Sequence, residues 1–325
     1  MQRILYSIFL ISISLIVFFT IYLSSVGVET SKFNNIIINE IKKKDPSIQI
    51  SLNKIKIKFD IKKIQIYLST FEPQITYQGI TIPIKEINLY TKIISILKSR
   101  NEINQAIVSF QNFKFKDIQK LAIRIKPSNF KTYLLNNFND GEINKILIDV
   151  KLDKNLNIKD YKINGSVKKV NINVLNNLSI QDVSLNFITD KNLTLINSLN
   201  AKYKDISISN GSLTLKRDKQ IDIEGKFNSQ FNLNENEINK LLMKSKIKLL
   251  EKNKAKVKGS LVHNFSFKID ENFKLIDYDY KSEGNISEAQ IVFKDDLRNN
   301  FINKPIKKFS IFKTNLGINL NKKKK

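Results

Sequence analysis

Apolar and polar residues alternate along most of this chain, from residue 48 to residue 320. Near the start of this stretch, Ile55, Ile57 and Phe59 alternate with Lys56 and Lys58. A period of two is the repeat of a β-strand, because successive side chains of a strand point to opposite faces of its sheet. The pattern therefore predicts a series of strands, each with one apolar and one polar face.

Turn signals recur at short spacing between these strands, as in Asn-Asp-Gly at 139–141 and Ser-Asn-Gly at 209–211. Short strands joined by tight turns form an antiparallel meander. Strands are predicted even where the alternation is brief, as at residues 121–125. The expected fold class is mostly β: a transmembrane helix at the amino terminus, then a long antiparallel β-meander curled into an open groove, with a few short helices.

Four segments depart from the period of two. They are residues 29–44, 91–99, 130–138 and 234–252, each predicted to be a helix or, at 91–99, a helix or turn. In the last segment, Asn234 and Glu237 have the spacing of a capping box, and Ile238, Leu241 and Leu242 begin an apolar stripe. We expect this helix to cover the sheet or to cap one of its edges.

An uncharged run of twenty residues at 4–23, ILYSIFLISISLIVFFTIYL, precedes the meander. As a helix, about twenty residues span the roughly 30 Å hydrocarbon core of a bilayer. A cleaved secretory signal is the alternative, but its apolar core has only about 7–15 residues and a small-residue cleavage site follows it. Residues 24–29 offer no Ala-x-Ala sequence, so the run is predicted to be an uncleaved anchor. The anchor positions selected along it are Ile4, Leu10, Leu15, Phe19 and Leu23.

The charges beside the anchor predict its orientation. Arg3 and the amino terminus precede the run, and Glu29 follows it. Positive residues are retained on the cytoplasmic side of a membrane helix. We therefore expect a single-pass protein of a bacterial inner membrane, with a cytoplasmic amino terminus and the bulk of the chain in the periplasm.

The chain is basic, with 55 Lys and Arg against 30 Asp and Glu and a formal net charge of +25. Nucleic-acid surfaces favour clustered Arg and stacking aromatic side chains, whereas these Lys residues are spread along almost every predicted strand. Solvated strand faces explain the charge better, so no nucleic-acid partner is expected, although attraction to anionic lipid headgroups is compatible with it.

Few residue types are available for catalysis or metal binding. The chain has no Cys and a single histidine, His263, within an alternating apolar run. A catalytic base needs a reacting partner and an orienting group, and neither is identifiable near His263, which is expected to lie on a strand surface. Since phosphate-binding loops, nucleophile elbows and metal-spaced His sets are also missing, no enzyme activity, metal or cofactor is predicted.

The domain organisation predicted from these patterns has three parts. Residues 1–25 form a cytoplasmic tip and the anchor, residues 26–128 a membrane-proximal helix and sheet, and residues 129–325 a continuing groove. The alternation is still in progress when four terminal Lys residues end the sequence. Two interpretations are open: an edge strand defended by Lys, or a chain truncated at its carboxyl end.

Residues 1–125 combine an anchor, a short amphipathic helix and a strand-rich segment. The features that matter are a strand pair ending at 66–68, a Pro-x-Ile-x-Tyr segment at 73–77, a strand at 80–89 and a basic stretch at 92–100 leading into a strand at 103–110. In this arrangement the chain resembles AsmA-like proteins, in particular the large YhdP- and TamB-type members of Gram-negative envelopes. The remainder resembles them only in being a Lys- and Asn-rich meander.

The resemblance implies a periplasmic β-groove with an apolar interior, which shields phospholipid acyl chains during lipid transport and outer-membrane biogenesis. The residue pattern agrees, because a meander with one apolar face and few helices has little to cover that face. A sheet folded on itself as a sandwich is the alternative. The candidate groove residues are Ile57, Phe59, Ile66, Ile148, Val150, Ile163, Leu185, Phe187 and Ile208.

Two functions compete. In the first, the groove carries phospholipid from the inner membrane, and direction comes from an outer-membrane or periplasmic protein partner. In the second, an anchored scaffold of the cell envelope docks a protein and carries no lipid.

Overall fold

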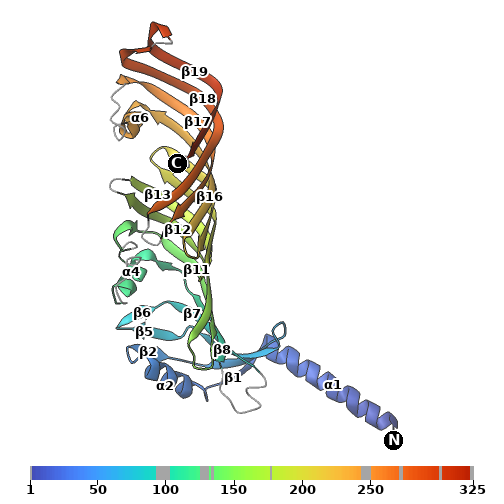
Figure 1. Ribbon diagram of the computed structural model, residues 1–325. Coiled ribbons are helices and arrows are strands. Elements are labelled where there is room, and N and C mark those ends of the chain that lie inside the picture. Colours follow the sequence, from blue (N-terminus) through green and yellow to red (C-terminus); the bar gives the residue numbers. More distant parts are fainter. Residues whose placement is uncertain are drawn as a thin grey trace. The chain divides into compact units, whose positions relative to one another are not determined.

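The computed structural model describes residues 2–92, 103–124, 132, 135–175, 178–242, 250–270, 274–299 and 302–322. The chain divides into two compact units (Figure 1). The first unit contains residues 1–128 and 143–165, and the second contains residues 129–142 and 166–325. As the alternation predicts, the fold is mostly β, with one long antiparallel sheet, an apolar helix at the amino terminus and few other helices. Neither sheet is strongly curled.

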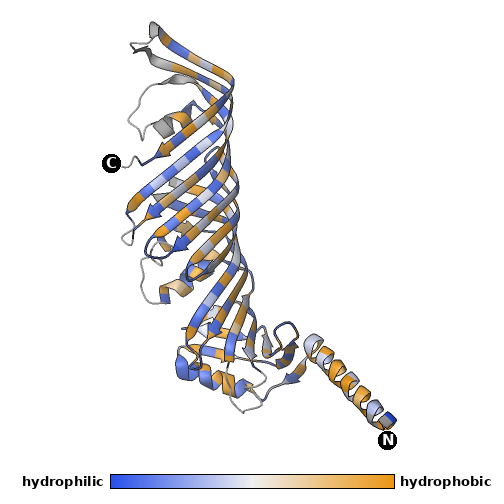
Figure 2. Ribbon diagram, turned by 45° about the vertical axis from the view of Figure 1, so that its right-hand side comes forward, coloured by the Kyte–Doolittle hydropathy of each residue, from blue (hydrophilic) through white to orange (hydrophobic). Residues whose placement is uncertain are grey.

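The first helix, α1 (Gln2–Ser25), contains the predicted anchor. Its 24 residues reach about 36 Å at the α-helical rise, and the window from Tyr6 to Ser25 is long and apolar enough to cross a membrane. Ile4, Leu10, Leu15 and Phe19 are exposed along the helix, which Figure 2 shows as predominantly hydrophobic. Leu23 is half-buried. Such exposure of large apolar side chains is normal for a helix surrounded by lipid.

The helix α1 ends immediately before a strand. The backbone N–H groups of Val26 and Gly27 both donate to the Tyr22 carbonyl oxygen, at 2.9 and 3.0 Å, and Gly27 has a φ of +76°. Glycine adopts this left-handed conformation without a Cβ penalty, and it is the usual residue after a helix. Strand β1 (Val28–Thr30) follows directly, so only two residues separate α1 from the sheet. The prediction of helix at Glu29 and Thr30 is therefore wrong.

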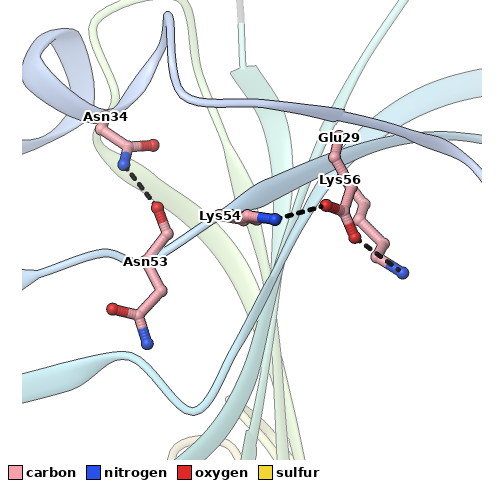
Figure 3. Close-up of polar contacts among 5 residues, drawn as sticks. All are labelled: Glu29, Asn34, Asn53, Lys54 and Lys56. Atoms are coloured by element: carbon pink, nitrogen blue, oxygen red, sulfur yellow. Dashed lines mark hydrogen bonds and ion pairs between the residues drawn. The ribbon is translucent and has the colours of Figure 1, made fainter.

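Polar contacts join this junction to the neighbouring strand (Figure 3). The Glu29 carboxylate lies 3.1 Å from Lys54 Nζ and 3.5 Å from Lys56 Nζ, and the hydrogen bond from Lys54 lowers the pKa of Glu29. The Asn34 side-chain amide donates to the Asn53 carbonyl oxygen at 2.7 Å. These contacts tie β1 and the start of the following helix to the same segment of chain.

In the first unit the long sheet contains six main strands, and three shorter strands form a separate sheet. In sheet order, the main strands are β1, β3 (Ile55–Asp60), β4 (Gln65–Phe71), β7 (Ile84–Thr91), β8 (Ile103–Phe110) and β11 (Glu142–Leu152). The separate sheet contains β2 (Ile48–Ser51), β5 (Gln74–Tyr77) and β6 (Ile80–Ile82). The two-residue strand β9 (Phe113–Lys114) pairs with β11.

Among the described residues of the first unit, two helices follow α1. Helix α2 (Asn34–Lys44) ends in three Lys residues, which suit the negative end of a helix dipole, and it packs on β2. Helix α4 (Phe115–Arg124) includes residues 121–124, for which a strand was predicted. Phe115 is buried, and Ile118 and Leu121 are half-buried on the same side of α4 at helical spacing. A period of three to four was mistaken for a period of two over this short segment.

The second unit continues the meander with longer strands. They are β13 (Leu178–Asp190), β14 (Leu193–Tyr203), β15 (Ile206–Arg217), β16 (Ile221–Asn234), β17 (Leu250–Ile269), β18 (Leu275–Asn299) and β19 (Ile302–Asn321), and each pairs antiparallel with the next. Strand β12 (Ile158–Leu175) begins in the first unit and ends in the second, where the short β10 (Phe138–Asn139) pairs with it. In the helix predicted at 130–138, residues 132 and 135–137 are helical and residue 138 belongs to β10, whereas residues 130, 131, 133 and 134 lie outside the described residues. Residues 93–99 of the helix or turn predicted at 91–99 also lie outside them.

Helix α6 (Glu235–Leu242) is shorter than the predicted helix 234–252, because β17 already begins at Leu250; residues 243–249 lie outside the described residues. Its capping box forms as predicted: the Asn234 backbone N–H donates to Glu237 Oε2 at 2.8 Å, and the Glu237 N–H donates to Asn234 Oδ1 at 3.3 Å. Ile238 packs with Leu233 and Ala255, so α6 covers a corner of the sheet.

Candidate functional site

The apolar strand positions of the first unit are brought onto one face by the strand register. One cross-strand row runs Ile57, Leu68, Leu89, Ala106 and Val150. Directly paired residues of antiparallel strands share a face. A second pair, Phe59 and Ile66, and a second row containing Ile148 lie on this same face, because their positions differ from the first row by two along each strand. Five candidate groove residues therefore come together here, all half-buried.

A wider apolar face spans the second unit. Its central row crosses seven strands and consists of Phe187, Ile196, Leu213, Gly225, Phe265, Tyr280 and Leu320. A parallel row contains Ile208, Ser229, Leu261, Gly284 and Leu316. Leu185 lies two residues before Phe187 on β13 and shares its face. Three further candidates, Leu185, Phe187 and Ile208, thus lie on this surface, which we call the apolar face of the second unit. The ninth, Ile163, is half-buried in β12.

Glycine residues let large side chains lie flat on this face. A Cβ atom on Gly225 would come within 2.4 Å of Phe265 Cζ and 2.5 Å of Leu213 Cδ2. The ring of Phe265 and the side chain of Leu213 therefore occupy the space above Gly225. Aromatic and aliphatic groups form a continuous layer there, as large side chains do in a packed interior.

Only part of the apolar face is covered by the described residues. Helix α6 packs over one corner, against a cluster that includes Phe231 and Val257. Along the edge strand β19, the large side chains of Phe309, Leu316 and Leu320 remain 42%, 37% and 54% exposed. A row of exposed apolar side chains at a sheet edge is unusual for a surface that faces water alone.

The opposite face of the second unit is more polar, although Val262 and Phe312 are exposed on it. Lys256 pairs with Glu288 at 2.9 Å, and Lys281 pairs with Glu283 at 2.8 Å. A shallow hollow of about 690 Å³ is lined by residues of both faces: Asn228, Ser260 and Glu283 from the polar side, and Ser229, Leu261, Gly284 and Leu316 from the apolar face. The alternation of hydrophilic and hydrophobic positions along each strand is visible in Figure 2.

The prediction that His263 is a surface residue without partners is wrong. His263 is only 7% exposed, on the apolar face of the second unit. Its Nε2 atom lies 2.7 Å from Ser229 Oγ and its Nδ1 atom lies 2.8 Å from the Tyr280 hydroxyl. The Phe227 ring stacks on the imidazole with centroids 4.4 Å apart. The partners are 34 and 17 residues away in the chain, so the local pattern around His263 carries no signal of them.

This polar group links three neighbouring strands within apolar surroundings. Burial lowers the pKa of His263, because an apolar environment disfavours the charged imidazolium. A neutral imidazole donates through one nitrogen and accepts through the other, which matches the two hydroxyl partners. Ser282, directly opposite His263 on β18, is fully buried, and its hydroxyl has no hydrogen-bond partner among the described residues.

The close approach of Ser229 to His263 is the distance of a nucleophile and its base. Ser229 is mid-strand, paired with Ile208 on one side and Leu261 on the other, and its backbone belongs to these ladders. An oxyanion site needs backbone N–H groups directed at the substrate rather than at neighbouring strands. Among the residues that the structure describes, no group of three or more His, Cys, Asp or Glu side chains could hold a metal ion. What the geometry shows is a side-chain link between three neighbouring strands.

Comparisons with known protein families, with curated proteins and with solved structures found no match to this chain.

Proposed function

We propose that the protein is an anchored sheet of the bacterial cell envelope that shields phospholipid acyl chains on its apolar faces. The observation that carries the proposal is the row from Phe187 to Leu320, which keeps one apolar face in register across seven strands. At about 4.8 Å between strands, this row is about 29 Å wide. That width accommodates an extended acyl chain.

A groove curled around the lipid is part of the proposal. Positive-φ residues interrupt the strands at Ser198 and Asn210, where the pairing registers shift. Such bulges bend a strand and increase its local twist. They support a sheet that closes further around an acyl chain than an unbroken ladder would.

Acyl-chain shielding requires no chemical reaction. The lipid would enter from the inner membrane at the anchored end, and a periplasmic or outer-membrane partner would set the direction of movement. The resemblance of residues 1–125 to AsmA-like proteins of the YhdP and TamB type belongs to this proposal. The mid-strand position of Ser229, whose backbone belongs to the ladders with Ile208 and Leu261, supports a non-enzymatic role.

Photocrosslinking tests the proposal. A photoreactive residue at Ile148 or Leu185 on the apolar faces is expected to capture phospholipid in membranes. Ile188 is the matched control, because it follows Phe187 on β13 and pairs with Leu195 on the polar side. We expect little lipid adduct at Ile188. Protein adducts alone at Ile148 and Leu185 would contradict lipid shielding and favour the scaffold, whose apolar face would be filled by a docked protein.

The side of the membrane on which the sheet lies is tested by a separate experiment. Arg3 and the amino terminus favour a cytoplasmic start, whereas Lys32 and the three Lys residues that end α2 follow the anchor within twenty residues and favour the reverse. We propose the periplasmic orientation because long domains are translocated largely regardless of charge. Since the chain has no Cys, Lys154→Cys supplies a unique thiol. A membrane-impermeant maleimide should label it in spheroplasts; labelling only after lysis would place the sheet in the cytoplasm.

A further inference from the structure

The β3–β4 hairpin lies beside helix α1 in the first unit. Strand β1 leaves α1 and pairs antiparallel with β3, so that Val28 is opposite Ile57 and Thr30 is opposite Ile55. Strand β3 therefore runs back towards the anchor. The four residues after Ile57, up to Ile61, extend about 13 Å past the level of Val28 at the rise of a strand. Strand β3 contacts α1, and Figure 1 shows the hairpin ending beside the carboxyl end of that helix.

The tip of this hairpin exposes two large apolar side chains and two positive charges. Ile61 is 54% exposed and Ile64 is 68% exposed, and Lys62 and Lys63 between them are also exposed. Loop tips in water normally carry small and polar residues. Apolar side chains flanked by Lys are instead typical of segments that lie in the interface of a bilayer.

Ile64 has a backbone conformation that is rarely adopted by its residue type. Its φ is +52°, in the left-handed region. A β-branched residue in this region is a genuine outlier, and its backbone is strained. Asn or Gly would relieve that strain at an exposed turn. Isoleucine instead places an exposed apolar side chain at this turn.

Polar contacts hold the tip in this conformation. The Lys63 backbone N–H donates to Asp60 Oδ1 at 3.1 Å. Lys63 Nζ donates to Gln105 Oε1 at 3.1 Å and lies 4.1 Å from the centroid of the Tyr90 ring. Lys63 is thereby fixed against β7 and β8, while Ile61 and Ile64 keep their exposure. The conformation of the tip is therefore stabilised by contacts with the rest of the first unit.

We propose that residues 61–64 form a second membrane contact, in which Ile61 and Ile64 insert into the interface of the bilayer that α1 spans. Lys62 lies beside anionic headgroups in this arrangement. The inference rests on α1 being a membrane anchor, as the proposed function requires. Two attachment points fix the orientation of the sheet on the bilayer and bring Phe59 and Ile66, which flank the tip on the apolar face, next to the lipid.

Single-tryptophan fluorescence tests this contact, because the chain contains no tryptophan. Ile61→Trp and Ile64→Trp are placed separately in the full chain, which is reconstituted in vesicles of phosphatidylcholine and phosphatidylglycerol. Lipids brominated on their acyl chains quench tryptophan that enters the bilayer. We expect quenching at both positions, weaker than for Leu15→Trp within α1. Phe71→Trp is the matched control, since Phe71 is exposed at the opposite end of β4, and it should not be quenched.

The outcomes separate the tip from the anchor. Quenching at position 15, with positions 61 and 64 as unquenched as position 71, would overturn the second contact and leave the anchor intact. Loss of quenching at position 15 would overturn the anchor, and the tip contact with it. Blue-shifted but unquenched emission at 61 and 64 would show burial against protein and would also overturn the inference.

A second variant distinguishes membrane insertion from a structural role. Ile64→Asn, made in the Ile61→Trp chain, removes the apolar side chain and suits the left-handed conformation. We expect quenching at position 61 to fall by roughly half, because interfacial binding scales with the buried apolar area. Thermal stability should be unchanged or higher. Unchanged quenching would show that Ile64 does not hold the tip in the bilayer.

Discussion

The Nε2 atom of His263 lies 2.7 Å from the hydroxyl oxygen of Ser229 in the middle of the apolar face of the second unit. Tyr280 bonds the other ring nitrogen, and Phe227 stacks on the ring. One imidazole thus joins strands β16, β17 and β18 through side chains. Within a sheet held mainly by its backbone ladder, this is a polar link made by side chains.

Stability should fall as the pH drops below about 6.5, the ordinary pKa of histidine. Burial lowers the pKa of His263 in the folded state, so the unfolded chain binds a proton first and its population rises. The stabilisation is fully present above the unfolded pKa and is lost towards the lower, folded pKa. Urea unfolding of the full chain in detergent at pH 7.5 and 5.5 measures this change.

The variant His263→Gln separates the contribution of this imidazole to the pH dependence of stability from the contribution of the carboxylates. Gln is neutral throughout the range and can bond both hydroxyl partners. Its stability should therefore depend less steeply on pH between these two values than that of the natural chain. Equal slopes in the two proteins would show that protonation of His263 does not destabilise the sheet.

Gly284→Ala should destabilise the second unit by about 1–3 kcal/mol. A Cβ atom at Gly284 would lie 2.1 Å from the Ser260 carbonyl oxygen and 2.8 Å from Leu261 Cα, so backbone would have to move. Gly317 on β19 is the control, because no atom lies within 4 Å of its Cβ position. Gly317→Ala should be neutral or stabilising by about 0.4–1 kcal/mol. Chemical denaturation midpoints compare the two, and similar shifts would contradict the packing argument.

Gly27→Ala should disturb the connection between α1 and the sheet. The new Cβ atom would lie 2.8 Å from the Ile57 carbonyl oxygen, at a residue whose φ is +76°. Gly79→Ala is the control, since its φ is +79° but its surroundings are open. The control should cost about 1 kcal/mol from backbone strain alone, and Gly27→Ala more. Protease cleavage near residues 26–30 should increase only for Gly27→Ala.

Asn234→Ala should destabilise α6 by about 1 kcal/mol, because the Asn234 side chain caps the helix at the Glu237 N–H. The loss would loosen Ile238 from the corner cluster. Asn236→Ala, at an exposed position of the same helix, is expected to be neutral or stabilising because alanine has the higher helix propensity. Hydrogen exchange of the α6 amides measures both; equal protection in the two variants would argue against the cap.

The local sequence pattern predicted the secondary structure correctly where a segment was long or carried a specific motif such as a capping box. The alternation predicted the strands, and Asn234 with Glu237 predicted the start of α6. The pattern failed where segments were short: residues 121–124 are helical, and residues 28–30 form a strand because they pair with β3. Helix α6 stops before Leu250 because the chain there enters a ladder with β18. Pairing with distant residues decided these cases.

The amino-acid sequence is enough to predict an uncharged helix long enough to span a bilayer and strands with one apolar face each. Both predictions follow from periodicity and length, which need no knowledge of neighbouring strands. Which residues share a face is set by strand pairing in the folded sheet, because a slip of one residue in register reverses every side chain of a strand. Strand pairing places Ser229 and Tyr280 against His263, and it directs the hairpin with Ile61 and Ile64 back towards α1. These contacts depend on which strands pair and in which register, and the local sequence pattern does not specify that pairing.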